Sequence, residues 1–293
     1  VIFGQNHAVE AVVAAIKTAK AGIGNDEKPI SSFLFTGPTG VGKTELTKQL
    51  AQFLGIDFVR IDMSEFMEKH SISKLIGSPP GYVGYDQGGY LTEEINKKPH
   101  SVLLLDEIEK AHPDIFNILL QVLDYGTLTD SNGRNINFKN TIIVMTSNTG
   151  AVEADNEAVG FIEQESVDKF EKAVSKAFTP EFRNRLDGII NFNKLDNNNL
   201  NSVVEKLLVE VQAKLNLKRI DLEWTDAVVQ KILDDGFDAK LGARPLSRSV
   251  DKHIKKPVSA MLIDDKARKG DTILVGIKAK QLDFKVKKKE KIT

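Results

Sequence analysis

Residues 37–44 read Gly37-Pro38-Thr39-Gly40-Val41-Gly42-Lys43-Thr44. This stretch fits the pattern G-x-x-x-x-G-K-[ST], in which a turn of small residues lets several backbone N–H groups converge on phosphate oxygens. An apolar run at residues 33–35 precedes it and predicts a buried strand, and a helical pattern follows it. The lysine supplies a mobile cation and the threonine a hydroxyl for Mg²⁺. In this strand–turn–helix context the stretch predicts a phosphate site rather than a chance glycine-rich turn.

A second apolar run, at residues 102–105, ends in the carboxylates Asp106 and Glu107. An uninterrupted apolar run is typical of a central parallel strand covered on both faces, and ligands of such sheets bind at the carboxyl edge. Asp106 can hold a metal ion through water, and Glu107 can deprotonate an attacking water. Alone, the run could be a strand that ends in a solvated acidic turn. Beside the phosphate motif it predicts nucleotide hydrolysis, because a kinase must exclude water and needs no water-activating base.

Composition narrows the class of protein. The chain has 293 residues, enough for two domains, and its net charge of −1 gives no overall field that would attract nucleic acid. The absence of cysteine excludes disulfides, thiolate metal sites and cysteine nucleophiles. No apolar run reaches transmembrane length and no signal peptide is recognisable, so we expect a soluble cytoplasmic protein without membrane or nucleic-acid partners. The chain starts without methionine, directly at a structural motif, and we expect it to be part of a longer protein.

Strand and helix patterns alternate along the first two thirds of the chain. We expect strands at residues 33–36, 58–61, 102–105, 142–146 and 189–192, and helices at 7–20, 43–54, 91–97 and 115–125. This alternation predicts an α/β fold, with a parallel sheet flanked by helices. After residue 194 helical patterns dominate, at 200–217, 227–233 and 247–261, and two short strands follow at 272–277 and 282–286. We therefore expect a large domain at 1–193 and a small, mainly helical domain at 194–293.

Polar residues near the ends of predicted elements have two interpretations each. Asn148 follows the strand at 142–146 and either orients the attacking water or is a turn asparagine. Arg183 and Arg185 precede the last strand of the large domain. They either stabilise phosphoryl-transfer charge, even from a neighbouring subunit, or are surface arginines paired with Glu181 or Asp187.

The small domain contributes one further candidate, Arg244. It precedes Pro245, and proline suits the first turn of a helix. Arg244 therefore lies at a helix start, where it either reaches back to the nucleotide or is an ordinary surface residue.

Two segments are predicted to be irregular. Prolines and glycines interrupt Gly77-Ser78-Pro79-Pro80-Gly81-Tyr82-Val83-Gly84-Tyr85, so this loop presents Tyr82 either to a partner or to its own domain. Residues 151–168 contain six acids and no bases and are expected to be flexible and solvated. Their apolar part, Val159-Gly160-Phe161-Ile162, either docks on a partner or anchors the loop through Phe161.

Together these segments resemble the second ATPase module of the Clp/Hsp100 unfoldase family, and most closely its ClpA branch. The resemblance covers nearly the whole chain and rests on Phe3-Gly4-Gln5, Asp62-Met63-Ser64-Glu65 and residues 37–44, 77–84, 103–112, 117–130, 180–187 and 242–245. It implies an AAA+ fold, with a large α/β domain and a small lid domain, in a homo-hexameric ring that binds ATP or ADP with Mg²⁺ at subunit boundaries.

The resemblance also assigns roles to residues. The motif residues Gly37, Pro38, Thr39, Gly40, Val41, Gly42, Lys43 and Thr44 would hold the phosphates. Thr44 and Asp106 would hold Mg²⁺, and Glu107 would activate water. Asn148 would be the first sensor, Arg185 the finger acting on the neighbour's ATP, and Arg244 the second sensor. Ile2 and Phe3 would lie near the adenine.

The irregular segments acquire partners through the same resemblance. Tyr82 and Val83 would grip unfolded or tagged protein substrates in a central pore. Val159, Gly160 and Phe161 would dock on a ClpP-type peptidase, although the usual triplet of that branch is Ile-Gly-Leu; adaptors would act through parts absent from this chain. The nearest alternative is an Hsp100 disaggregase without a peptidase partner, which lacks this loop. The charge balance and the Gly-Tyr-Val-Gly loop argue against a nucleic-acid motor, and Glu107, Asn148 and Arg185 argue against an ATP-binding switch without turnover.

Overall fold

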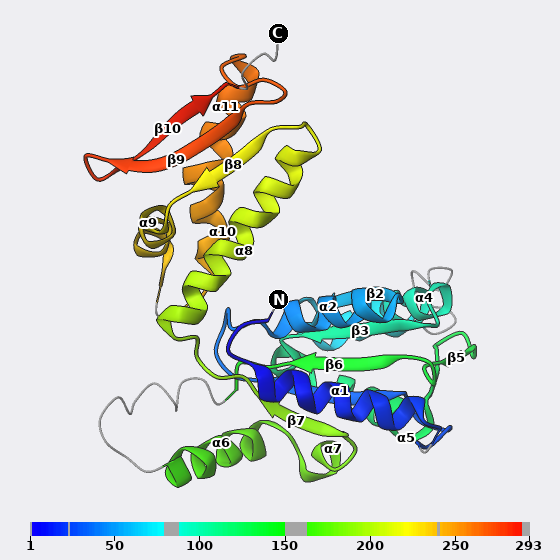
Figure 1. Ribbon diagram of the computed structural model, residues 1–293. Coiled ribbons are helices and arrows are strands. Elements are labelled where there is room, and N and C mark those ends of the chain that lie inside the picture. Colours follow the sequence, from blue (N-terminus) through cyan, green and yellow to red (C-terminus); the bar gives the residue numbers. More distant parts are fainter. Residues whose placement is uncertain (1, 23, 79–87, 150–162, 239–240, 289–293) are drawn as a thin grey trace.

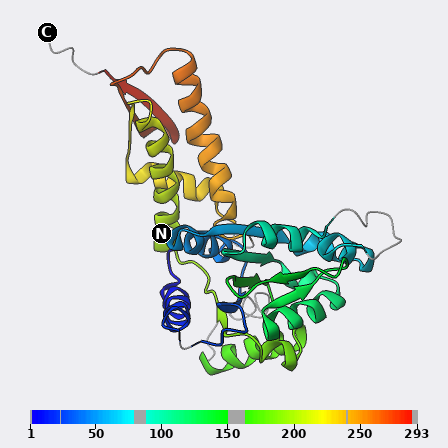
Figure 2. The same cartoon turned by 90° about the vertical axis from the view of Figure 1, so that its right-hand side faces the viewer.

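The chain builds two packed bodies that meet at one edge of the larger one (Figures 1 and 2). The computed structural model describes residues 2–22, 24–78, 88–149, 163–238 and 241–288. The larger body contains the N-terminal region and a five-stranded sheet, and the smaller body contains the C-terminal helices and strands. Within the described residues, no helix is both long and apolar enough to cross a membrane.

The main sheet has the strand order β2-β3-β6-β1-β7, and every pairing in it is parallel. Its strands are β1 (Ser31–Thr36), β2 (Asp57–Asp62), β3 (Ser101–Asp106), β6 (Ile142–Thr146) and β7 (Gly188–Asn191). Every residue of β1, β3 and β6 is buried, as expected for inner strands covered on both faces. The predicted parallel α/β sheet is confirmed.

Helices cover both faces of this sheet because successive strand residues point to opposite sides. In β1, Phe33 and Phe35 join one apolar cluster and Leu34 joins the other. The first cluster includes α1 (Asn6–Lys20) and α2 (Lys43–Leu54). The second includes α3 (Ile72–Ile76), α4 (Tyr90–Lys97), α5 (Pro113–Tyr125), α6 (Glu163–Ala177), α7 (Pro180–Arg183) and the hairpin of β4 (Thr127–Thr129) and β5 (Asn135–Asn137).

One expectation about the acidic segment is wrong in part. Residues 163–168, expected to be flexible, form the first turns of α6. The reason lies further along the helix, where Val174 is buried in the core and Phe170 packs against it. Tertiary packing of these residues stabilises the whole helix, including its acidic start.

The small body has its own apolar core and a three-stranded sheet of order β10-β9-β8. Its elements are α8 (Asn197–Asn216), β8 (Asp221–Trp224), α9 (Asp226–Gly236), α10 (Arg244–Val250), α11 (Lys256–Ile263), β9 (Thr272–Lys278) and β10 (Gln281–Lys287). The single helix expected at 247–261 is instead α10 and α11, joined by a π-helical turn at Asp251–Lys255. The sequence analysis missed β8, which has only four residues and pairs parallel to β9.

Candidate functional site

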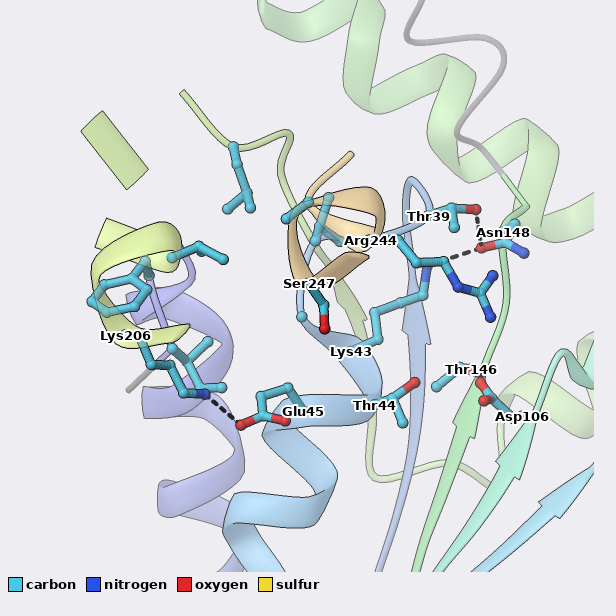
Figure 3. Close-up of a pocket in the computed structure, with 18 of the residues that line it drawn as sticks. Thr39, Lys43, Thr44, Glu45, Asp106, Thr146, Asn148, Lys206, Arg244 and Ser247 are labelled. Atoms are coloured by element: carbon cyan, nitrogen blue, oxygen red, sulfur yellow. Dashed lines mark hydrogen bonds and ion pairs between the residues drawn. The ribbon is translucent and has the colours of Figure 1, made fainter. Parts of the chain in front are cut away.

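A pocket of about 430 Å³ lies where the two bodies meet. The carboxyl ends of β3 and β6, the start of α2, and helices α8 and α10 all contribute to it (Figure 3). Its lining brings together these residues predicted from sequence: Ile2, Phe3, Thr39, Gly40, Val41, Gly42, Lys43, Thr44, Asp106, Glu107, Asn148 and Arg244. The pocket therefore gathers residues from both ends of the chain, from Ile2 to Ser247.

The phosphate-binding motif forms a turn whose carbonyls hold the lysine. Lys43 is the first residue of α2, and its Nζ donates to the carbonyl oxygens of Gly37 at 2.5 Å and Pro38 at 2.9 Å. A third donation, of 3.1 Å, goes to Asn148 Oδ1. Gly37 and Pro38 thus contact the lysine without lining the pocket themselves. The N-terminal end of α2, where free N–H groups favour anions, opens into the pocket.

Burial lowers the pKa of the Lys43 ammonium from its ordinary 10.5 to about 8. The carboxylates of Glu109, Asp106 and Glu107 act in the opposite direction and favour the charged form. A phosphate group placed beside Lys43 would add to them and raise this pKa again.

ADP affinity should consequently fall as the pH rises through about 8. Below that pH Lys43 is already charged, whereas above it binding must take up a proton, which weakens affinity by up to ~10-fold per pH unit. Calorimetry at pH values on either side of the Lys43 pKa, in buffers of different ionisation enthalpy, measures this uptake directly. Flat affinity without proton uptake would show that Lys43 does not contact the nucleotide.

Asp106 is held at the end of β3 by hydrogen bonds to both oxygens. Thr146 Oγ1 donates to Oδ1, and Arg60 donates to Oδ2 from Nε at 3.1 Å and from Nη2 at 2.6 Å. Thr146 Oγ1 also accepts from the backbone N–H of Glu107 at 3.1 Å. Thr146 therefore fixes both acidic residues relative to β6.

Glu107 has an unusual backbone conformation and a bound partner. Its φ of 58° is in the left-handed region, where residues other than Gly, Asn and Asp are uncommon. Its carboxylate forms an ion pair with Lys110, one turn further along the chain. Glu107 lines the pocket, so its carboxylate can serve as a base there once it is released from Lys110.

Asn148 lies in the pocket beside Lys43 rather than in a remote turn. Its Oδ1 accepts from Lys43 and, at 3.3 Å, from Thr39 Oγ1 (Figure 3). Its backbone N–H donates to Glu109 Oε1 at 2.9 Å. These three hydrogen bonds fix the asparagine beside Lys43 in the pocket.

The small body closes the pocket through backbone contacts. The N–H of Ala243 donates to the carbonyl of Gly40 at 3.2 Å. A Cβ on Gly40 would lie 2.3 Å from the Leu241 carbonyl oxygen, and one on Gly242 would lie 2.6 Å from that of Thr39. These two positions therefore require glycine. Arg244 begins α10 as predicted and reaches into the same pocket as Lys43 (Figure 3).

An ion pair and an apolar wall complete this junction. Lys206 on α8 donates to Glu45 Oε1 on α2 at 2.5 Å. Burial alone would raise the pKa of Glu45, but this donation and the lysine charge hold it below its ordinary value. The apolar wall consists of Ile2, Phe3, Leu195, Val203, Leu207 and Ala243, and it suits a flat ring such as adenine.

Oxygen ligands for a divalent cation are present in this pocket. Thr44 supplies a hydroxyl and Asp106 a carboxylate, which are hard oxygen donors of the kind that Mg²⁺ prefers. Among the described residues no group of three or more His, Cys, Asp or Glu side chains could hold a metal alone. This sparse donor set fits Mg²⁺, which usually takes one or two protein ligands together with substrate phosphates and water.

Arg185 is not part of the pocket of its own chain. Its Nε donates to Asp124 at 2.6 Å, and its Nη2 lies 3.2 Å from Glu181. Glu181 is one of the two partners considered from sequence; the other, Asp187, instead accepts from the N–H of Ser32 at 2.6 Å. Tyr82, Val83, Val159, Gly160 and Phe161 lie outside the described residues.

Several lining residues were missed by the sequence analysis. They are Glu45, Arg60, Thr146, Leu195, Val203, Lys206, Leu207, Ala243 and Ser247. The position of Thr146, at the carboxyl end of a predicted parallel strand, was a usable signal for one of them. The residues from α8 carried no such signal, because only the meeting of the two bodies brings them to the pocket.

Known proteins match the chain over nearly its whole length. The AAA domain (Cdc48 subfamily) matches residues 28–189, and the C-terminal D2-small domain of ClpB protein matches residues 195–275. A ClpA homolog protein of Fuscovulum blasticum is 51% identical over 99% of this chain and 37% of its own length. ClpC/MecB of Bacillus subtilis, a negative regulator of genetic competence, is 48% identical over 94% of this chain and 35% of its own. Chaperone protein ClpB of Oceanobacillus iheyensis is 48% identical over 95% of this chain and 36% of its own length. The chain thus spans about a third of the length of these relatives.

Proposed function

Because the chain belongs to the Clp/Hsp100 family of AAA ATPases, as a second ATPase module, we propose that it hydrolyses ATP to unfold and translocate proteins. The pocket between the two bodies carries this proposal, since it unites Lys43, Asp106, Glu107, Asn148 and Arg244 around one volume. We also propose residues 1–193 and 194–293 as the large domain and the small lid domain.

Different residues of the pocket bind the phosphates, the Mg²⁺ ion and the adenine. Lys43 leaves the carbonyls of Gly37 and Pro38 to meet the β- and γ-phosphates, while the N–H groups at the start of α2 bind them along the helix axis. Thr44 and Asp106 would hold Mg²⁺, which when bound neutralises the charge of the phosphate oxygens. Ile2 and Phe3 cover the adenine together with the residues that the small domain contributes to the apolar wall.

Hydrolysis requires an oriented and deprotonated water. Glu107 takes its proton after turning away from Lys110, and Asn148 positions the water or the γ-phosphate beside it. Arg244 senses the phosphates from α10, so a change of nucleotide moves the whole small domain against the large one. The Glu45–Lys206 ion pair bridges the same two domains and favours the closed arrangement.

Assembly into a ring would bring an arginine of one subunit to the nucleotide of the next. We place Arg185 at the boundary of a homo-hexamer, where it contacts ATP held by the neighbouring subunit. Its position outside its own pocket is consistent with this role, because the side chain remains 26% exposed and its partners, the Asp124 carboxylate and the carboxylate and backbone carbonyl of Glu181, also lie outside that pocket.

The substrate grip rests on the Gly-Tyr-Val-Gly loop, with Tyr82 and Val83 lining a central pore. An aromatic ring contacts many kinds of side chain, so it can pull on protein without reading one sequence. Tyr82→Ala in the full-length motor should retain most ATPase activity and abolish unfolding of a stable tagged protein. With a fluorescent tagged protein as substrate, loss of fluorescence measures unfolding and phosphate release measures ATPase activity. Unfolding at the original rate would remove the pore role.

The partner of the motor is the finer question, because the relatives include both protease subunits and ClpB chaperones. We propose a ClpP-type peptidase, docked through Val159, Gly160 and Phe161. A hexamer presents several such loops, and their joint binding can exceed the affinity of one loop by ~10²–10⁴-fold. The acidic residues around the triplet would keep it accessible to solvent. The alternative remains a disaggregase that works without peptidase.

Phe161→Ser should therefore weaken recovery of the peptidase steeply while ATP hydrolysis continues, since the triplet lies in a segment separate from the nucleotide motifs. The measurement is a pull-down of ClpP-type peptidase by the full-length motor, and Glu157→Gln in the same segment serves as the control. Recovery of the peptidase by Phe161→Ser at the level of Glu157→Gln and of the unaltered motor would favour the disaggregase.

A further inference from the structure

Arg60 is a cationic residue of the pocket that no phosphate motif contains. It lies on β2, one of the two edge strands of the sheet, where Val59 and Ile61 join the apolar cluster that contains α5. Strand alternation directs Arg60 to the opposite face, on which α2 begins. There its guanidinium reaches the pocket and remains 46% exposed.

The guanidinium occupies the Asp106 oxygen that Thr146 leaves available. Both Nε and Nη2 of Arg60 donate to Oδ2, at 3.1 and 2.6 Å, whereas Thr146 donates to Oδ1. The Asp106 side chain is only 12% exposed, and its Oδ2 already accepts two hydrogen bonds from Arg60. A carboxylate in this state has few lone pairs left for water on a metal ion.

Charge balance explains the arrangement. Asp106 and Glu107 are adjacent carboxylates, and their repulsion is relieved when each has its own cation. Lys110 pairs with Glu107, and Arg60 pairs with Asp106. A divalent cation at Asp106 would take over this neutralisation and would repel the guanidinium.

We propose that Arg60 is a positioning residue that neutralises Asp106 before nucleotide binds and yields that carboxylate when Mg²⁺ enters with the nucleotide. The exchange sets the Mg²⁺ concentration at which the pocket retains nucleotide. This inference rests on the proposed nucleotide site and adds to it a competition between one arginine and the metal ion.

The test is a Mg²⁺ titration of fluorescent ADP binding to the 293-residue chain. Arg60→Gln should lower the free Mg²⁺ needed for half-maximal retention by about three- to tenfold, because Asp106 becomes available without competition. The same variant should bind ADP several-fold more weakly in EDTA, since an unneutralised carboxylate then faces the phosphates. Arg60→Lys keeps the positive charge but loses the paired donation from Nε and Nη2. It should lower the Mg²⁺ requirement as well, but by less than Arg60→Gln.

Arg134→Gln is the matched control. Arg134 is 45% exposed and pairs with Asp130 at 2.7 Å, but it does not line the pocket. Its Mg²⁺ titration should equal that of the unaltered chain, and thermal melting checks that each variant is folded. An unchanged or higher Mg²⁺ requirement in both Arg60 variants would overturn the competition while leaving the nucleotide site standing. Absence of Mg²⁺-dependent ADP binding in the unaltered chain would instead overturn the proposed function, and the competition with it.

Discussion

Replacing Glu107 with glutamine should slow ATP hydrolysis by about 10²–10⁴-fold and leave nucleotide binding nearly unchanged, the usual effect of losing a general base. Glutamine has almost the same shape but cannot accept the proton of the attacking water. Thr146 Oγ1 accepts from the backbone N–H of residue 107, so that contact survives the substitution. Binding should persist because Lys43 and the start of α2, not Glu107, are the groups proposed to contact the phosphates.

Steady-state phosphate release and calorimetric ADP binding measure the two properties separately. Lys43→Ala provides the reciprocal comparison, since it removes the phosphate cation and should abolish tight binding. Normal turnover by Glu107→Gln in an assembled sample would refute the assigned base.

Replacing Arg185 with alanine should reduce hydrolysis by about 10³-fold in assembled rings, a loss typical of an arginine finger. In the proposed role the arginine stabilises charge on the transferring phosphoryl group of the neighbour. Asp124→Asn is the matched control, because it removes the 2.6 Å ion-pair partner and keeps the arginine. If Arg185 only stabilises its own domain, the two variants should lose similar activity.

Mixed rings separate a role in trans from a role in cis. Subunits carrying Arg185→Ala retain an intact pocket of their own, so they should hydrolyse ATP when a neighbour with Arg185 completes that pocket. Subunits carrying Glu107→Gln cannot be rescued in this way. Full-speed hydrolysis by isolated monomers, matched by the Arg185→Ala monomer, would contradict the trans role.

The sequence predicted the inner part of the fold well because its signals were local. The apolar run at 102–105 became a buried inner strand, and Gly42-Lys43 became the junction of a turn with α2. The small domain was predicted less accurately. A four-residue strand such as β8 is stabilised by its pairing with β9, 51 positions away at Leu222↔Ile273 (273 − 222), and its own residues give a weak signal.

Residues of the site that depend on long-range packing were likewise not predicted from the sequence. Residues that belong to short motifs could be named in advance, whereas Arg60 and Lys206 could not. Arg60 reaches Asp106 only because β2 pairs beside β3, and Lys206 reaches Glu45 only because α8 packs on the large domain. Gln5 illustrates a third case: its motif was noticed, but its role was not. Its fully buried amide donates to Asn193 O at 2.7 Å and accepts from Asn193 N at 3.0 Å, which ties the N-terminal segment to the end of the large domain.

In the proposed function, ATP hydrolysis in this pocket serves protein substrates. The most direct measurement is the ATPase rate of the assembled protein with an unfolded polypeptide, with DNA, and with neither. We predict a rate that rises with unfolded polypeptide, is unchanged by DNA, and is lost in Glu107→Gln. A rate that rises with DNA, or that does not change with unfolded polypeptide, would show that the motor does not act on proteins.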